Sequence, residues 1–136
     1  MAIAHCTILN SIDQFMLSID AGSERVYENV RRPGKFDVLL RNLAWLKTLD
    51  RKVSLNFVLQ QANWHDLENF VKLAKQFGYW ANITRLEDWG TWSGFADQDV
   101  IGNPEHSDHL LAVQELRRVH ALYPTLGWGA SLPTTI

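Results

Sequence analysis

Polar side chains that could bind a ligand occupy alternate positions in strand-like segments of the sequence. Ser18 and Asp20 alternate with apolar residues in one segment, and Asn56 and Gln60 do so in another. Successive side chains of a strand point to opposite faces, so these residues are expected together on one polar face of a sheet. The remaining polar residues expected on that face are Ser54, Asn82 and Thr84. This face is the first candidate for binding chemistry.

Three polar residues are expected where the strands end. Asp20 closes the first strand, Gln60 closes the second, and Asn63 follows three residues later. Ligands bind at the carboxyl ends of parallel strands in β/α barrels and in open α/β sheets, which favours a binding site here. The alternative is structural, because buried polar groups must be hydrogen-bonded and these residues could bond to one another or to water inside a barrel.

A loop that carries two tryptophans follows the third strand-like segment. Trp89 and Trp92 lie in the sequence Asp88-Trp-Gly-Thr-Trp-Ser-Gly-Phe. Tryptophan offers a large contact area and one N–H donor, so with Arg85 and Glu87 these residues are expected to form a substrate or partner surface. In the alternative interpretation, the rings only cover the end of the sheet.

Two histidines near the last expected helix could place imidazoles on one helical face. His106 and His109 have Glu105 and Asp108 beside them, a set that zinc can accept. No third ligand stands at a supporting spacing, and acidic or polar residues also suit the first turn of a helix. We therefore expect no metal site.

Strand and helix signals alternate along the chain. The expected strands are residues 15–20, 53–60 and 79–86. The expected helices run from Ser23 through Val30, over residues 36–49, from a cap at Asn63 over 64–77, and from Asn103-Pro104 to Leu122. This order predicts an α/β fold of about three parallel strand–helix units, forming half of a β/α barrel. Because the strands alternate polar and apolar residues, the helices are expected on one face only.

Size, charge and cysteine content restrict the class of protein. A chain of 136 residues fits a single domain, with an irregular tail expected over 124–136. The net charge of −2 and the scattered Lys and Arg argue against nucleic acid. No apolar run approaches about 18 residues, so we expect no membrane span and a cytoplasmic location. Cys6 alone cannot hold an iron–sulfur cluster.

Several ordered segments carry a family resemblance. They are Leu17-Ser-Ile-Asp-Ala-Gly-Ser-Glu-Arg-Val-Tyr-Glu-Asn-Val-Arg-Arg, Phe36-Asp-Val-Leu-Leu-Arg-Asn-Leu, Asn56-Phe-Val-Leu-Gln-Gln-Ala-Asn, Leu67-Glu-Asn-Phe-Val-Lys-Leu-Ala-Lys-Gln-Phe-Gly and Ile83-Thr-Arg-Leu-Glu-Asp-Trp-Gly. Together they resemble the second half of the radical S-adenosylmethionine (SAM) enzymes, over roughly residues 12–120. The family usually has Gly directly after the Asp, whereas Ala21 precedes Gly22 here.

The resemblance implies an incomplete β/α barrel and SAM as a possible cofactor. Ser18 and Asp20 would face the ribose or methionine end of SAM, and Arg31 or Arg32 would pair with its carboxylate. The residues implied to edge the same cleft are Asn56, Gln60 and Asn63. The family's Cys-x-x-x-Cys-x-x-Cys loop and Gly-Gly-Glu segment do not occur in this sequence. The chain is therefore expected to bind no iron–sulfur cluster and to be inactive alone.

Two functions follow from these patterns. The chain is either a fragment, split subunit or degenerate relative of a radical SAM enzyme, or a non-enzymatic interaction module that uses the sheet edge and the Trp loop. A half barrel leaves strand edges unpaired, and only residues 3–10 are expected to cover the first one. A homodimer or a complex with a missing N-terminal half is therefore expected. The substrate cannot be named from these segments.

Overall fold

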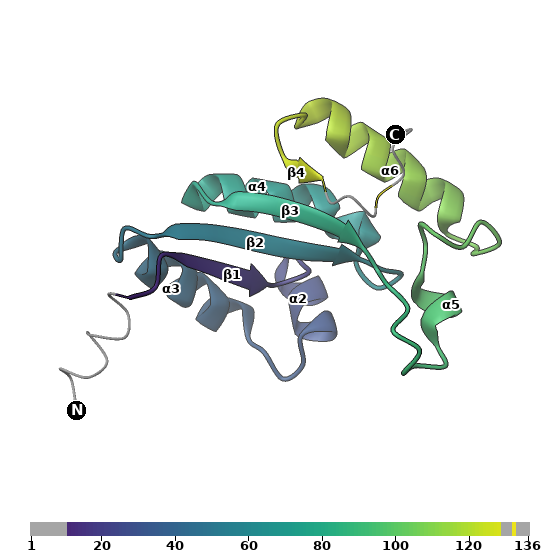
Figure 1. The fold of residues 1–136 in the computed structure, drawn as a ribbon, viewed down its shortest axis with the longest axis horizontal. Helices are drawn as coiled ribbons and strands as arrows, with labels where there is room; N and C mark the ends of the chain where they lie inside the picture. Colours follow the sequence, from purple (N-terminus) through teal and green to yellow (C-terminus); the bar gives the residue numbers. More distant parts are fainter. Residues whose placement is uncertain (1–10, 129–131, 133–136) are drawn as a thin grey trace.

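A four-stranded parallel sheet with the order β1-β2-β3-β4 lies at the centre of the molecule (Figure 1). The structure is a computed structural model that describes residues 11–128 and 132. The strands are β1 (Gln14–Ser18), β2 (Lys52–Leu59), β3 (Trp80–Arg85) and the short β4 (Gly127–Trp128). Every neighbouring pair is parallel, which confirms the predicted α/β class. In the described part of the chain β1 and β4 are the two edges of an open sheet.

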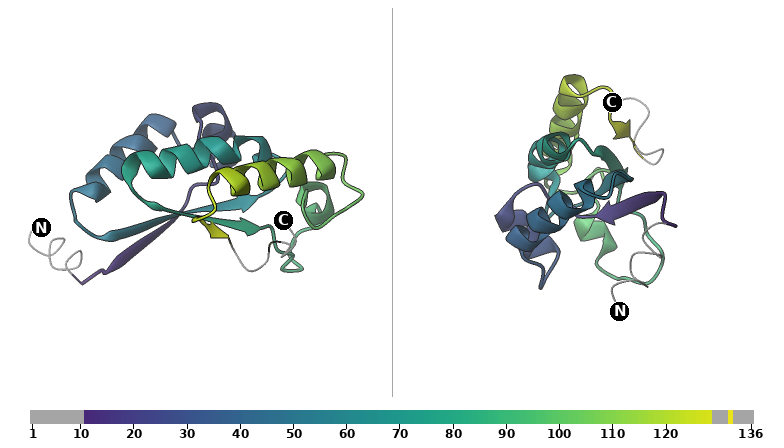
Figure 2. Two further views of the ribbon diagram at one scale, coloured as in Figure 1. Left: turned by 90° about the horizontal axis from the view of Figure 1, so that it is seen from above. Right: turned by 90° about the vertical axis from the view of Figure 1, so that its left-hand side faces the viewer.

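Helices connect successive strands. They are α2 (Glu24–Val30), α3 (Phe36–Lys47), the short 3-10 helix η1 (Trp64–Asp66), α4 (Leu67–Phe77), α5 (Phe95–Gln98) and α6 (His109–Leu122). Figure 2 shows α3, α4 and α6 on the same side of the sheet, as the alternating strands predict. No helix of residues 11–128 covers the opposite face of β1, β2 and β3, which is called the uncovered face below. None of the helices in residues 11–128 has the length and apolar character needed to cross a membrane.

The hydrophobic core lies between the sheet and its helix layer. Leu55 and Phe57 of β2 are completely buried, and the ring of Phe57 lies 4.9 Å from that of Phe70 in α4. The other fully buried side chains of this layer include Leu43, Leu59, Leu67, Ile83, Leu116 and Val119. Each large apolar side chain buried in this way stabilises the fold by about 1.5–3 kcal/mol. This layer fixes the positions of the strand ends.

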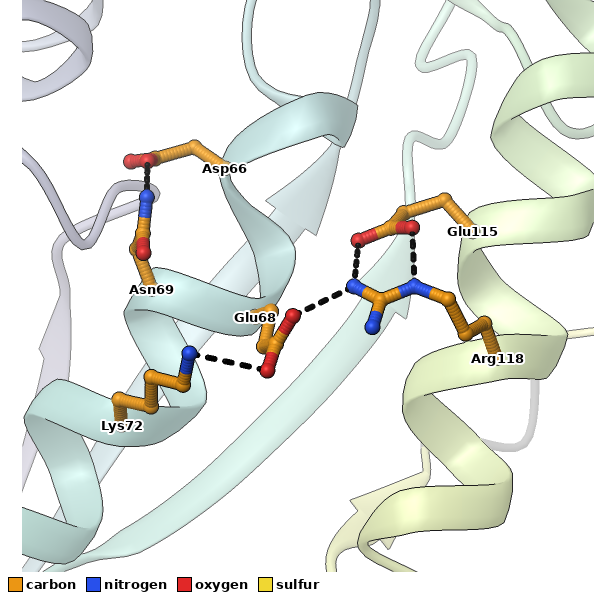
Figure 3. Close-up of polar contacts among 6 residues, drawn as sticks. All are labelled: Asp66, Glu68, Asn69, Lys72, Glu115 and Arg118. Atoms are coloured by element: carbon orange, nitrogen blue, oxygen red, sulfur yellow. Dashed lines mark hydrogen bonds and ion pairs between the residues drawn. The ribbon is translucent and has the colours of Figure 1, made fainter.

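A cluster of ion pairs joins α4 to α6 at the surface above the core (Figure 3). A guanidinium nitrogen of Arg118 lies 2.6 Å from Glu68 and 2.7 Å from Glu115. Lys72, one turn further along α4, lies 3.0 Å from Glu68. Burial of Leu116 just beside this cluster gives the two helices an apolar contact as well. The helix layer is therefore held by both packing and charge.

Several element boundaries differ from the sequence prediction. The last helix begins at His109, because residues 103–108 form turns. In this helix Leu110, Leu111 and Leu122 are exposed, whereas Ala112 is buried. The tail expected to be irregular contributes β4, which pairs with β3. Cys6, the covering segment 3–10 and the tail residues other than 124–128 and 132 lie outside the described residues.

Candidate ligand-binding site at the carboxyl ends of the strands

A row of polar side chains, Ser18, Asn56 and Asn82, crosses the uncovered face of the sheet. Ser18 of β1 is in register with Asn56 of β2, and Asn56 with Asn82 of β3. Residues in register share one face of the sheet, so all three point away from the helix layer. Nδ2 of Asn82 lies 3.5 Å from Oδ1 of Asn56, at the limit of a hydrogen bond. This polar row contains Ser18, which the resemblance implies to face SAM, and Asn56, which it implies to edge the same cleft.

Asp20, predicted to close the first strand, lies two residues beyond the end of β1 and is 4% exposed. Its Oδ1 accepts a hydrogen bond from the backbone N–H of Val58 at 2.8 Å. Its Oδ2 accepts from the guanidinium of Arg31, which also forms an ion pair with it. The structure therefore brings together Asp20 and Arg31, both implied by the resemblance, but pairs them with each other.

The environment of the Asp20 carboxyl has opposing electrostatic effects. Burial raises the pKa of Asp20 above its ordinary value, while the N–H of Val58 and the Arg31 guanidinium act in the opposite direction. Arg31 is partly exposed, and its buried Nε has no hydrogen-bond partner among the described residues. The part of the Arg31 side chain that reaches solvent is the part that a ligand could contact.

Asn63 ties the ends of β1 and β2 together from the inside. Its Nδ2 donates to the carbonyl oxygens of Asp20 at 3.0 Å and Val58 at 2.9 Å. Its Oδ1 accepts from the N–H of Gln60 at 2.9 Å. Asn63 stands at the N-cap position of η1, as predicted, but its side chain is fully buried and makes no capping hydrogen bond. Both amide hydrogens are used within the protein, which makes Asn63 a support for the strand ends.

Asp66 belongs to the same network but was not singled out from the sequence as a site residue. Its Oδ2 accepts from the N–H groups of Gly22 at 2.6 Å and Ser23 at 2.9 Å. Gly22 is so close to α4 that a Cβ there would lie 1.9 Å from the backbone nitrogen of Phe70. A glycine directly after a strand is a signal of close backbone approach. Asp66 lies 44 residues from Gly22, so no local sequence pattern could identify Asp66 as the partner of Gly22.

An open cavity of about 410 Å³ lies where β2 and β3 end. The lining residues of this strand-end cavity are Val58, Thr84, Arg85, Leu86, Glu87 and Trp89. The sequence-predicted surface thus contributes Arg85, Glu87 and Trp89. The volume falls within the usual range for small-molecule sites, about 300–1,000 Å³. Apolar walls, an indole ring and charged groups of both signs can hold a flat molecule that also carries polar groups.

The loop beside this cavity is anchored by Asp99. Arg85 pairs with the buried Asp99 at 3.2 Å, and Oδ1 of Asp99 accepts from the N–H of Gly102 at 2.8 Å. Trp92, the remaining residue of the predicted surface, does not line the cavity. A Cβ at Gly94 would lie 3.0 Å from Nε1 of Trp92, so its ring packs over its own loop.

Gln60 and Arg32 have different environments. Gln60 is half-buried after β2, and its carbonyl accepts from the N–H groups of Asn63 and Trp64, both at 3.1 Å. Arg32 is exposed and donates to Oδ1 of Asn29 at 2.6 Å. Of the two arginines implied to pair with a carboxylate, Arg31 is the one that lies in the Asp20 network.

The histidine pair anchors the loop before α6. Nε2 of His106 lies 2.9 Å from the carbonyl oxygen of Asp97, and Nδ1 of His109 lies 2.9 Å from that of Val100. Nδ1 of His106 accepts from the N–H of Asp108 at 3.0 Å. Residues 11–128 contain no group of three side chains that could hold a metal ion.

No protein-family model matches the chain, and no curated protein or solved structure matches it either. The class of protein is thus defined by its fold and surface. It is an α/β unit whose parallel sheet is covered by helices on one face, with a polar row on the other face and a cavity at its strand ends.

Proposed function

We propose that the chain forms the second half of a radical SAM-type β/α core and contributes a surface that faces SAM or substrate, without catalysing a reaction alone. The uncovered face of the sheet would then point toward the interior of the barrel. The remaining strand–helix units would come from further chain or from another subunit. The ordered segments from Leu17 to Gly90 support this proposal, as does a parallel sheet with helices on one face.

The observation that carries the proposal is the continuity of the polar row with the strand-end cavity. Asn56 is in register with Asn82, and two positions further along the strands Val58 is in register with Thr84. Val58 and Thr84 line the cavity. A ligand laid along β2 would therefore meet hydroxyl and amide groups first and the indole ring of Trp89 next. Adenosine offers a matching sequence of ribose hydroxyls and a flat purine ring.

Arg31 is the residue best suited to the carboxylate of SAM in this proposal. Its side chain is partly exposed, and its guanidinium is already oriented by Asp20. Planar guanidinium groups bind carboxylates through paired N–H donors. The iron–sulfur cluster of such enzymes is held by several thiolates, and the one cysteine of this chain does not fit that ligand set. In this proposal the cluster would be held outside this chain.

Titration of the ¹⁵N-labelled chain with S-adenosylhomocysteine tests the proposal. Amide signals of Ser18, Asn56 and Thr84 are expected to shift in a saturable way at up to millimolar ligand. Asn56→Ala should weaken the binding about 10-fold, because it removes polar groups from the middle of the row. Gln76→Ala, on the exposed surface of α4, is the matched control and should leave binding unchanged. Absence of any shift in the wild-type chain would remove the SAM-facing role.

A second candidate function is a protein-interaction module. It is favoured by the exposure of Trp89, which leaves 82% of its surface in contact with solvent. Exposed tryptophans are enriched at the centres of protein interfaces. This second function would be favoured if Trp89→Ala abolished binding of a co-purified protein while the wild-type chain gave no saturable response to S-adenosylhomocysteine.

A further inference from the structure

A second cavity, of about 370 Å³, lies between α2 and the turn that follows β2. Its lining residues are Arg25, Val26, Asn29, Ala62 and His65. It shares no lining residue with the strand-end cavity. The two segments that form this basic cavity are separated in sequence but held together by Asp66, which bonds to the backbone in front of α2.

Hydrogen-bond donors predominate in the basic cavity. Within the described residues, the side chains of Arg25 and His65 make no hydrogen bond and no ion pair. Oδ1 of Asn29 accepts from Arg32 at 2.6 Å, which leaves the Nδ2 group of Asn29 as a donor and adds a second guanidinium beside the cavity. Val26 is buried and provides an apolar floor.

The nearby carboxylates do not neutralise these groups. No acidic side chain lines the basic cavity. Asp66 is buried and bonded to Gly22, Ser23 and Asn69. Glu28, on α2, is paired with Lys35 at 2.8 Å. The guanidinium of Arg25 and the imidazole of His65 are therefore available to an external acceptor.

We propose that the basic cavity binds the phosphoryl group of a phosphate monoester. Donors converge on it from two separate segments, α2 and the turn after β2, and a tetrahedral phosphoryl group can accept from both directions at once. Arginine binds phosphate through two N–H groups, and such charge-assisted hydrogen bonds are about twice as strong as neutral ones. This site lies beyond the proposed SAM-facing surface, because SAM carries no phosphate and the basic cavity lies apart from the polar row.

The test is an NMR titration of the full chain, with labelled arginine side chains, using inorganic phosphate and phenyl phosphate as probes. Saturable shifts are expected at the Arg25 side chain and at the His65 amide. Arg25→Gln and His65→Gln should each weaken the binding at least about 10-fold, because each removes one charge-assisted or ring donor. Acetate, at matched ionic strength, should bind at least about 10-fold more weakly than phosphate.

Arg117→Gln is the matched control. Arg117 is an exposed arginine of α6 that lies outside the basic cavity, so its replacement should leave phosphate binding unchanged. The proposal would be overturned if the signals of Arg25 and Arg117 shifted equally and without saturation as phosphate is added. It would also be overturned if Arg25→Gln or His65→Gln bound phosphate with wild-type affinity, or if acetate bound as tightly as phosphate. Arg25→Gln should not change the response to S-adenosylhomocysteine, so failure of this site and failure of the proposed function give different results.

Discussion

At Gly22 the turn after β1 runs directly against the backbone of α4. A Cβ added there would lie 1.9 Å from the nitrogen of Phe70 and 2.1 Å from the carbonyl carbon of Asn69. These are helix backbone atoms, so the clash can be relieved only by moving the turn or α4. We expect Gly22→Ala to lower the free energy of unfolding by about 3 kcal/mol, measured by urea denaturation.

Gly90 provides the control for that experiment. It has φ of 70° and nothing lies within 4 Å of an added Cβ, so Gly90→Ala introduces backbone strain without a clash. Its expected cost is about 1 kcal/mol. Equal losses in Gly22→Ala and Gly90→Ala would show that the close approach of the turn to α4 is not what requires glycine at position 22.

Asp20 gives the fold a defined dependence on pH. Burial raises the pKa of Asp20 in the folded state, so the folded chain holds this proton more tightly than the unfolded chain does. The stability that comes from this proton is fully present at a pH below the pKa of Asp20 in the unfolded chain. It is lost as the pH rises through the pKa of Asp20 in the folded chain. The unfolding free energy of the wild type minus that of Asp20→Asn should therefore decrease from pH 4 to pH 7 in urea denaturation.

Glu68→Gln should show the opposite trend. Hydrogen bonds from Arg118 and Lys72 lower the pKa of Glu68, so its contribution is present at neutral pH and is lost as the pH falls through the folded pKa. The wild-type stability minus that of Glu68→Gln should increase from pH 4 to pH 7. If both differences had the same sign of slope, the environment of Asp20 would not be the one described above.

The positions of single residues were predictable to different degrees. Alternation along the strands was enough to place Ser18 and Asn56 on one face, because that property depends only on local geometry. The long-range hydrogen bonds of Asp20, Asn63 and Asp66 were not predictable, since they join residues that are 38 to 44 positions apart. Asn63 shows the consequence: a residue that resembles a helix cap in sequence is used to hold two strand ends.

At the scale of the elements, α6 has a buried side chain, Leu116, next to the exposed ion pairs that join it to α4 (Figure 3). Leu116→Ala removes a buried side chain and should cost about 2–5 kcal/mol. Arg118→Ala removes exposed ion pairs and should cost much less, with a loss that shrinks further at high salt. Thermal unfolding in low and high salt measures both. An Arg118→Ala loss equal to that of Leu116→Ala would contradict this division.

Sequence patterns identify some of the helices and strands and not others. The regular strands and the apolar faces of α3 and α4 were predicted because each has a clear local period. The start of α6 was not, because Pro104 suits a first helical turn, whereas contacts with the preceding loop, among them the hydrogen bonds of His106 and His109, hold that segment in turns. The two residues of β4 carry no strand period, and their pairing with β3 is a tertiary effect.

At the scale of the whole molecule, the uncovered face of the sheet leaves apolar side chains in water. Met16 and Trp80 lie on either side of Ser54 in one register row, and are 65% and 67% exposed. Oγ of Ser54 is buried and has no hydrogen-bond partner among the described residues. The edge strand β1 adds backbone groups that a neighbouring strand could pair with. Such a surface favours association.

Without the remaining strand–helix units of the proposed core, we therefore expect the isolated chain to form a two-fold dimer through this face, with a total buried area of about 1,600 Å², so that dimer formation and S-adenosylhomocysteine compete for the same surface. Sedimentation at tens of micromolar should show twice the chain mass of 15.6 kDa. Trp80→Lys should convert the dimer to the monomer, because it places a charge where two apolar faces meet. Trp45→Lys is the matched control: Trp45 is a similarly exposed tryptophan, but it lies on α3 in the helix layer, so this variant should remain dimeric. A wild-type chain that sediments as a monomer, or equal effects of the two substitutions, would mean that the uncovered face does not pair with a second copy.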